Sequence, residues 1–474
     1  MLTLADIFEA LKHVRPSWAN QVITDAVVDS RQSTPGSLFI AVPGESVDGH
    51  DYVEDAFSRG ASFAIVECEI PAGIPLLDLR EDSVFDSESS PQVPCALRVE
   101  NSITALQQIA RFWRRQIDVR VIGITGSVGK STTKELMAAV LKQRYNTLKN
   151  LGNLNNEIGL PMTMLRLNEK HHRAVLEMGF YVPGEIAFLC DIAQPNIGVI
   201  TNIGTVHAER AGSQASIARG KAELVQALPA DPDGVAVLNY DDPLVRPMAE
   251  KTQARVFFYG LDHRADLWAD KIEGLGLDGI RFRLHYRNEV LHLRVPLIGR
   301  HSVHTVLRAA AVGLIEGLTW QEIINGLRSS GHTQLRLVAV RTEKGALLLD
   351  DTYNASPQST LAALNLLAEM EGRKIAVLGD MLELGQYERQ GHEMVGARAA
   401  AVADLLVTVG ERAHIIAAAA GRVGFPIANI TELDHSHQAI EHLRECLRAD
   451  DVVLVKGSHG VRMDRIVAAL ETRR

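Results

Sequence analysis

A short run that combines two glycines, a lysine and a serine is the part of this sequence whose residues most clearly indicate chemistry. The run reads Thr125-Gly126-Ser127-Val128-Gly129-Lys130-Ser131-Thr132, and it follows a mostly apolar stretch at 119–124. Glycines let backbone N–H groups turn inward around phosphate oxygens, and the N-terminus of a following helix adds positive potential. In such a loop the lysine reaches the terminal phosphates and the next hydroxyl binds Mg²⁺. The spacing therefore predicts a phosphate-binding loop between a strand and a helix.

This loop is a variant of the general phosphate-loop pattern. That pattern has a glycine five positions before Gly129, where this chain has Ile124. A glycine turn beside a solvated lysine is the alternative. The flanking elements, the lysine spacing and the hydroxyl together favour phosphate binding.

Two titratable residues stand where a metal bound to phosphate is expected. Glu177 ends the apolar run 174–176, and His207 follows a second run at 197–201. Ligands of open parallel sheets bind beyond the carboxyl ends of the strands. A structural role is the alternative for either residue alone, but both together beside a phosphate loop make a metal site an equal possibility.

Lys221 lies inside an apolar helical stripe that includes Ile217, Leu224 and Leu228. One interpretation is a lysine whose stem packs while its ammonium group reaches water. The other is a shielded amine, which is able to become neutral and to be modified. The residue pattern by itself favours the first interpretation.

Polar segments at both ends of the chain are further candidates for ligand binding. Asp29-Ser30-Arg31 and Asp48-Gly49-His50 suit an anionic or nucleotide ligand, although ordinary turn chemistry is favoured from their spacing. In the C-terminal part, four apolar runs end in polar residues at 350–357, 379–385, 410–411 and 456–458. Apolar runs that alternate with helical patterns predict strands of a parallel sheet. The four polar segments would then follow the carboxyl ends of its strands, and together they predict a ligand-binding site at that edge of the sheet.

Length and composition describe an ordinary globular protein. The 474 residues predict about three domains, which we place at 1–117, 118–331 and 332–474. The net charge of −9 without a basic run argues against nucleic acid as a partner. Four scattered cysteines, an acidic N-terminus and no apolar run of membrane-spanning length predict a cytoplasmic protein without a zinc site or membrane insertion.

Taken together, these residues resemble the ATP-dependent Mur ligases over nearly the whole chain. The similarity is carried by the phosphate loop, residues 153–161, residues 177–179, residues 200–207 and Lys221. The segments 29–31, 48–50, 350–357 and 379–385 are similar to the D-alanyl-D-alanine-adding members of that family. The Asp-Asn-Pro-Arg signature of members that add the third amino acid does not occur in this sequence.

The resemblance implies an α/β fold of three domains and an ADP-forming amide ligase. A small N-terminal domain would hold the UDP substrate, a central P-loop-type mononucleotide-binding domain would hold ATP and two Mg²⁺ ions, and a C-terminal Rossmann-like domain would bind the acceptor. The implied reaction joins D-alanyl-D-alanine to UDP-N-acetylmuramoyl-tripeptide through an acyl phosphate, in peptidoglycan precursor synthesis by a monomeric enzyme. Another Mur or folylpolyglutamate-type ligase and a non-catalytic nucleotide-binding relative are the alternatives.

The resemblance also assigns roles to single residues. The ATP-binding residues would be 125–132 with Asn202 and His301. The UDP substrate would contact Ser30, Arg31, Gly44 and His50. The acceptor would contact Arg336, Asp350, Asp351, Tyr353, Asn354 and Lys456. The catalytic residues would be Lys130, Glu177, His207 and Lys221. The metal ligands would be Ser131 and Glu177 for one Mg²⁺, His207 for the second, and Lys221 as a carbamate.

The chain departs from the family pattern on the nucleotide side. Members usually have Gly-x-His-Asn-x-x-Asn where this chain has Ser302 and Thr305 in place of the two asparagines, and His459 stands where arginine usually follows Lys-Gly-Ser. These changes affect residues that normally help to bind the nucleotide. The phosphate loop and the metal positions are intact.

Overall fold

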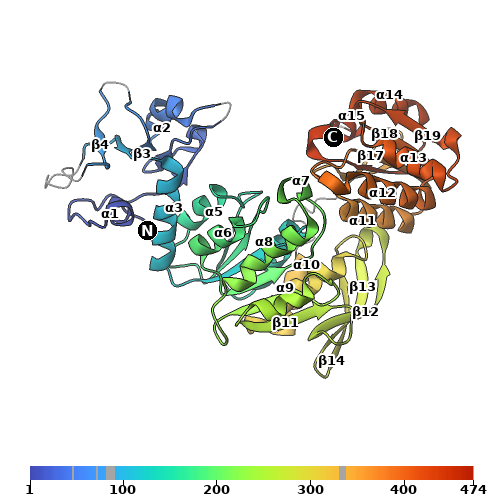
Figure 1. Cartoon of the computed structure of the whole chain (residues 1–474), viewed down its shortest axis with the longest axis horizontal. Helices are drawn as coiled ribbons and strands as arrows, with labels where there is room; N and C mark the ends of the chain where they lie inside the picture. The colour runs from blue at the N-terminus through green and yellow to red at the C-terminus, as the bar shows by residue number, and fades with distance from the viewer. Residues whose placement is uncertain (45–46, 71–72, 82–90, 330–337, 473–474) are drawn as a thin grey trace. The chain divides into compact units, whose positions relative to one another are not determined.

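Three β-sheets with flanking helices make up the chain (Figure 1). The computed structural model describes residues 1–44, 47–70, 73–81, 91–329 and 338–472. The chain forms two compact units. The first comprises Met1–Gly123, Tyr145–Gly179 and Glu185–Ile197, and the second comprises Ile124–Arg144, Phe180–Gly184 and Gly198–Arg474. The two boundaries between the three domains expected from the sequence, at 117/118 and 331/332, stay a prediction, and the second of them falls outside the described residues.

The N-terminal sheet has five parallel strands. Their order is β1 (Ala26–Val27), β2 (Leu38–Ile40), β3 (Phe63–Val66), β5 (Cys95–Arg98) and β4 (Leu76–Asp78). The helices of this part are α1 (Leu4–Lys12), α2 (Val53–Ser58) and α3 (Ser102–Gln116). Strands β2 and β3 are buried along their whole length, as expected for a parallel sheet that is covered on both faces.

The middle sheet has nine strands and carries the phosphate loop. Their order is β14 (Glu289–Val295), β13 (Ile280–Tyr286), β12 (Leu267–Gly274), β11 (Arg255–Gly260), β10 (Val235–Asn239), β9 (Ile197–Ile200), β6 (Arg120–Thr125), β8 (Arg173–Glu177) and β7 (Thr147–Lys149). The helices of this part are α4 (Lys130–Leu141), α5 (Gly159–Leu165), α6 (Glu185–Ala193), α7 (Ala208–Ala211), α8 (Gln214–Gln226), α9 (Ser302–Ile315) and α10 (Trp320–Ser329). Strands β12, β13 and β14 pair antiparallel, and buried residues alternate with more exposed ones along much of β13, which is the pattern of a sheet with one solvated face.

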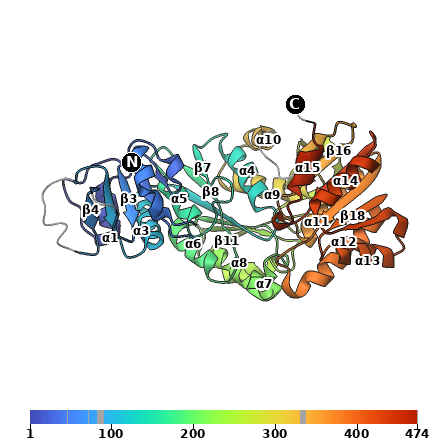
Figure 2. The same ribbon diagram turned by 90° about the horizontal axis from the view of Figure 1, so that it is seen from above.

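The C-terminal sheet has six strands with helices on both faces (Figures 1 and 2). Their order is β15 (Val338–Arg341), β16 (Leu347–Asp351), β20 (Asp451–Lys456), β17 (Arg373–Gly379), β18 (Leu405–Val409) and β19 (Ile430–Leu433). The helices are α11 (Pro357–Glu369), α12 (Glu388–Val402), α13 (His414–Arg422), α14 (Ser436–Cys446) and α15 (Asp464–Leu470). Successive strand residues serve opposite cores: Leu349 packs with α11, α12 and α13, whereas Leu348 packs with α14 and α15. The sheet is therefore doubly wound.

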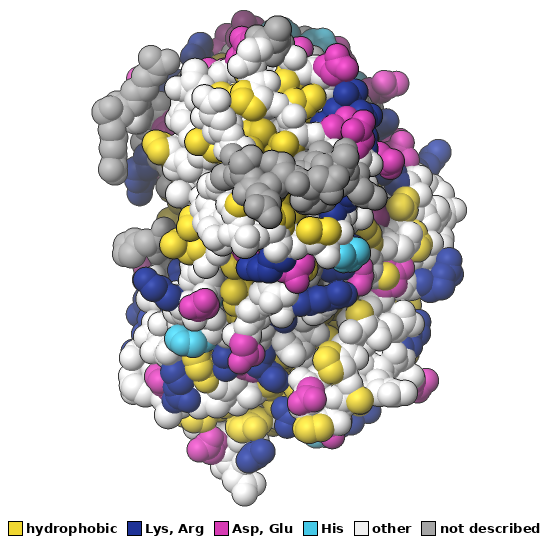
Figure 3. Space-filling model, turned by 90° about the vertical axis from the view of Figure 1, so that its left-hand side faces the viewer, with side chains coloured by type: hydrophobic (Ala, Val, Ile, Leu, Met, Phe, Trp, Pro, Cys, Tyr) yellow, Lys and Arg dark blue, Asp and Glu magenta, His cyan; other side chains and the backbone are white. Residues whose placement is uncertain are grey.

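The surface carries both signs of charge. Figure 3 shows Lys and Arg side chains interspersed with Asp and Glu on one face of the molecule, as expected from 49 basic and 58 acidic residues. The cysteines are free thiols. Within the described part of the chain, no helix is both long and apolar enough to cross a membrane.

Candidate active site

The phosphate loop begins where β6 ends, and its backbone is held by the residues that follow β9. Ser127 N donates to Asn202 O at 2.9 Å, and Val128 N donates to the Asn202 side chain at 3.0 Å. Thr201 Oγ1 donates to Val128 O at 2.8 Å. Gly129 is the N-cap of α4 with φ of 84°, a conformation that glycine adopts without strain. Thus the loop is ordered by its own neighbours, with Lys130, Ser131 and Thr132 in the first turn of the helix.

Two lysines from different helices converge on one carbonyl oxygen of this loop. Lys130 Nζ donates to Gly126 O at 2.8 Å, and Lys221 Nζ donates to the same oxygen at 3.0 Å. Lys221 is fully buried, and its Nζ lies 4.6 Å from the Phe180 ring centroid. The interpretation favoured from the residue pattern, an ammonium group that reaches water, is therefore wrong. The apolar stripe of α8 faces the protein interior, so the long side chain ends at the loop instead of at the surface.

His207 contacts an acidic side chain and lies close enough to both lysines for their charges to affect it. Its Nδ1 is 2.6 Å from Glu383 Oε2. Burial lowers the pKa of His207, and the charges of Lys130 and Lys221 lower it further, so the ring is neutral near pH 7 although Glu383 opposes the change. Because a carboxylate only accepts, the Nδ1 proton belongs to this bond and Nε2 keeps its lone pair. That arrangement is the one in which metal-binding histidines are oriented by a carboxylate.

Glu177 ends β8 in the first compact unit, where two asparagines hold it. Asn150 bonds both the backbone N–H and the carbonyl of Glu177, each at 3.0 Å, and Asn155 Nδ2 donates to Glu177 Oε1 at 2.9 Å. The side chain is 2% exposed. No cluster of three or more His, Cys, Asp or Glu side chains that suits a metal ion occurs among the residues described. The role of Glu177 as a metal ligand stays a prediction.

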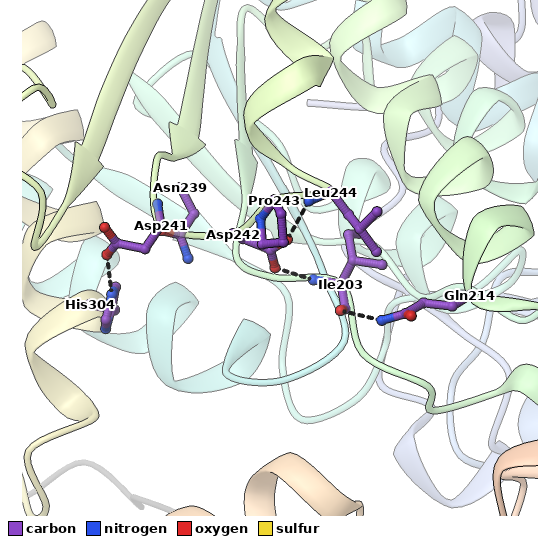
Figure 4. A pocket seen from close by; sticks show the side chains of 8 residues that line it. All are labelled: Ile203, Gln214, Asn239, Asp241, Asp242, Pro243, Leu244 and His304. Atoms are coloured by element: carbon purple, nitrogen blue, oxygen red, sulfur yellow. Dashed lines mark hydrogen bonds and ion pairs between the residues drawn. The ribbon is translucent and has the colours of Figure 1, made fainter.

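A pocket of about 360 Å³ opens beside the strand ends of the second unit (Figure 4). It is lined by Ile203, Gln214, Asn239, Asp241, Asp242, Pro243, Leu244 and His304. His304 Nε2 lies 2.8 Å from Asp241 Oδ2. Burial raises the pKa of Asp241, but hydrogen bonds from His304 and the Leu261 backbone outweigh burial and hold that pKa below its usual value. Asp241 is therefore an ionised carboxylate in the pocket wall, and its oxygens already accept hydrogen bonds from His304 and the backbone.

The residues expected to receive the acceptor lie together in the C-terminal part of the second unit. Asp351 pairs with Lys456 in the register of β16 with β20, and Lys456 Nζ is 2.6 Å from Asp351 Oδ2. The same amine donates to Asn354 O at 2.9 Å. The other two candidates are not among these contacts of Lys456: Asp350 accepts a hydrogen bond from the Thr352 hydroxyl, and Tyr353 is exposed. Arg336 lies outside the described residues.

His301 and the two departures from the family pattern stand at the start of α9. His301 is the exposed N-cap residue of that helix. Ser302 Oγ donates to Ile298 O at 2.7 Å, and Thr305 Oγ1 accepts from Arg308. Both replacements are therefore engaged within the protein.

The N-terminal candidates stabilise their own turns. Arg31 is exposed and forms a bidentate pair with Asp29. His50 uses both ring nitrogens, because Nδ1 lies 2.6 Å from Asp48 Oδ1 and Nε2 accepts from the Glu67 backbone at 2.9 Å. Ser30 is buried, and Gly44 N donates to Val47 O at 3.1 Å. The role of these residues in substrate binding stays a prediction.

Two residues of the second unit were missed by the sequence analysis. Glu383 stands within the polar segment 379–385, but nothing in its spacing connects it with His207, which is far away in the chain. Arg308 interrupts the alanine-rich helix α9. A charged residue on an apolar helical face, the same signal that drew attention to Lys221, marks its position in the sequence.

Fold and loop together define a class: a protein of successive α/β sheets that binds a nucleotide through a phosphate loop on its middle sheet. Comparison with known proteins narrows this class. The Mur ligase middle domain matches residues 124–313, the Mur ligase glutamate ligase domain matches residues 335–459, and the Mur ligase family catalytic domain matches residues 23–114. The chain belongs to the Mur ligase family.

Relatives with similarity over nearly the full length carry a specific name. The UDP-N-acetylmuramoyl-tripeptide–D-alanyl-D-alanine ligase of Bacillus subtilis is 33% identical over 99% of this chain and 98% of its own. A crystal structure of MurF from Acinetobacter baumannii has a TM-score of 0.83 and 30% identity and covers 98% of both chains. MurF from Thermotoga maritima, solved in complex with ADP, has a TM-score of 0.76 and 28% identity and covers 94% of this chain and 96% of its own. The family and the fold class predicted from the sequence are thereby confirmed.

Proposed function

We propose that this chain is the ATP-dependent ligase that joins D-alanyl-D-alanine to UDP-N-acetylmuramoyl-tripeptide. The observation that carries the proposal is the nearly full-length similarity to ligases of that name, with 33–35% identity to those of Synechocystis, Bacillus subtilis and Escherichia coli. The phosphate loop supports the proposal, because an ATP-dependent ligase needs a site for the phosphates of ATP. Two lysines, Lys130 and Lys221, reach this loop at the carbonyl oxygen of Gly126. Both substrates and ATP are small molecules, and the protein acts in peptidoglycan precursor synthesis as a cytoplasmic monomer.

In the proposed reaction the tripeptide carboxylate attacks the γ-phosphate of ATP and gives an acyl phosphate and ADP. The amine of the dipeptide then attacks the acyl carbon, phosphate leaves, and an amide bond remains. Lys130 offsets charge on the transferring phosphoryl group. Asp351, Asn354 and Lys456 contribute to the acceptor site, because their contacts gather polar groups at the ends of β16 and β20. Exclusion of water around the acyl phosphate protects it from hydrolysis.

The residues present fit the binding of Mg²⁺. Ser131 and Glu177 are oxygen donors of the kind that Mg²⁺ selects. His207 keeps Nε2 available because Glu383 occupies Nδ1, so we assign it to a second ion. Bound Mg²⁺ would neutralise charge on the β- and γ-phosphates.

Lys221 is proposed to be carbamylated. Its amine is buried and contacts the same carbonyl oxygen as Lys130. A carbamate at Lys221 would put a negative charge beside Lys130 in place of a second positive charge. The modification joins the neutral amine to CO₂ with loss of one proton. Intact-mass measurement under bicarbonate is the direct test, and a bare amine in fully active protein would contradict the assignment.

An acceptor-dependent ADP assay tests the proposed function. ADP release should require both UDP-N-acetylmuramoyl-tripeptide and D-alanyl-D-alanine, and Lys130→Ala should abolish it. L-alanyl-L-alanine, D-alanine and D-glutamate serve as control acceptors that separate this reaction from those of other amide ligases. Release that stays unchanged when the dipeptide is omitted would refute the proposal.

A further inference from the structure

Arg308 is a buried arginine whose donors are only partly used. The side chain lies among the alanines of α9 and is 3% exposed. Nη2 donates to Thr305 Oγ1 at 2.8 Å, and Nη1 donates to the Tyr259 hydroxyl at 3.3 Å. Nε is buried and has no hydrogen-bond partner within the described part of the protein. A guanidinium group carries five N–H donors, so these two bonds satisfy the smaller part of its capacity.

Neither partner of Arg308 carries a negative charge, and the Tyr259 ring, whose centroid lies 5.7 Å from the guanidinium carbon, gives only a cation–π contact. Thr305 is neutral, and burial raises the pKa of the Tyr259 hydroxyl, so that group is neutral as well. The Tyr259 proton is directed to the carbonyl oxygens of Ile200 and Thr201, at 3.0 and 3.1 Å. The tyrosine oxygen therefore accepts from Arg308 without carrying a negative charge.

The carboxylates of this region are engaged with other groups. The negative charges of Asp241 and Asp242 help burial to raise the pKa of Tyr259, so both carboxylates lie near it. Asp241 accepts from His304 and the Leu261 backbone, and Asp242 accepts from the backbone N–H groups that border the pocket. Neither forms an ion pair with the guanidinium among the contacts of the described residues. A cation removed from water without such a partner lowers the stability of the folded protein.

The guanidinium of Arg308 lies against the phosphate loop. A Cβ atom placed on Gly129 would be 3.2 Å from Arg308 Nη2. Gly129 is the N-cap of α4, a helix of 12 residues whose N-terminal N–H groups attract anions. Lys130 begins the same helix. Three sources of positive potential thus meet at one loop, and one of them is a buried arginine whose Nε lacks a partner.

We propose that Arg308 binds a phosphate oxygen of the nucleotide held by this loop, with Thr305 orienting the guanidinium group. The proposal rests on the proposed use of ATP, and its ligand class is a nucleoside di- or triphosphate. The proposal also gives a role to Thr305, which stands where the family usually has an asparagine. Its hydroxyl accepts a hydrogen bond from Arg308 and so holds the guanidinium group. A charge-assisted phosphate contact from α9 supplements the nucleotide contacts made by the loop itself.

Substitution by methionine distinguishes phosphate binding from a purely structural role. Arg308→Met retains much of the side-chain volume and removes the charge. We expect ADP affinity, measured by calorimetry without the other substrates, to fall by about tenfold or more, the range of a lost charged hydrogen bond. We also expect the melting temperature of the nucleotide-free protein to stay the same or rise, because a buried cation is removed. Arg308→Lys should recover part of the ADP affinity.

Arg114→Met is the matched control. Arg114 is also a buried arginine, but it donates to the carbonyl oxygens of Ala193, Ile117, Val119 and Gln194. Its loss should lower the melting temperature and leave ADP affinity unchanged. If Arg308→Met instead behaves like Arg114→Met, Arg308 is structural and the inference is wrong while the proposed function stands. Wild-type protein that binds neither ADP nor ATP would overturn both.

Discussion

Gly126→Ala probes the tightest contact in the phosphate loop. Gly126 has φ of 144°, and a Cβ atom there would lie 1.8 Å from Thr201 Oγ1 and 3.0 Å from Thr201 N. The side chain of Thr201 must rotate away, which breaks its 2.8 Å bond to Val128 O. The backbone of residue 126 and its carbonyl, which both lysines contact, must also shift.

The magnitude follows from these two costs. An alanine forced into this region of φ costs about 1–3 kcal/mol. The lost hydrogen bond adds about 0.5–1.5 kcal/mol. We therefore expect Gly126→Ala to lower the free energy of unfolding by about 1.5–4.5 kcal/mol and to weaken ADP binding. Gly424→Ala is the control, because Gly424 has φ of 95° with no atom within 4 Å of its added Cβ. It should show the backbone cost alone and normal ADP affinity.

A double-mutant cycle with Thr201→Ala supplies the decisive assay. Thr201→Ala removes the hydroxyl that collides with the new Cβ, so it should cost less in the Gly126→Ala background than in the wild type. Urea unfolding and ADP calorimetry on the four proteins measure this coupling, which should exceed about 1 kcal/mol. Additivity within about 0.5 kcal/mol would show that the two residues do not collide and would refute the reasoning.

The two remaining predictions concern the polar groups around the loop. Lys221→Met keeps the volume of the buried stem but removes the contact with Gly126 O. ADP release should fall by about tenfold or more, and bicarbonate should not restore it. The control Lys142→Met, at an exposed position, should release ADP at the wild-type rate. Rescue by bicarbonate would contradict this expectation. Glu383→Gln removes the charge that orients His207, so the Mg²⁺ concentration needed for half-maximal ADP binding should rise about 10-fold or more. The control Glu371→Gln, at an exposed position outside the site, should leave that concentration unchanged. An unaltered Mg²⁺ requirement in Glu383→Gln would show that this carboxylate does not support the metal site.

Local patterns in the sequence were sufficient for much of the fold. Apolar residues alternate with polar or charged ones at 280–284 and 291–295, which is the pattern of half-exposed strands, and these segments lie in β13 and β14. Four apolar runs predicted β16, β17, β18 and β20, because fully buried parallel strands are continuously apolar. The edge strand β19 was missed, since its residues are only half-buried and mix polar with apolar types. Strand β15, the antiparallel strand at the opposite edge, was also missed, because it has only four residues and most of them are exposed.

The sequence by itself determined the phosphate loop, the family and the residues around which a site is expected, because these depend on residue types at short spacing. Only the tertiary structure decided which distant groups meet. Lys221 reaches Gly126 O across 95 positions and His207 meets Glu383 across 176, and no periodicity encodes such distances. The environment of Arg308 is likewise a tertiary property: whether a buried charge is compensated depends on every element packed around it. For that reason the sequence located the loop, while the structure revealed the arginine beside it.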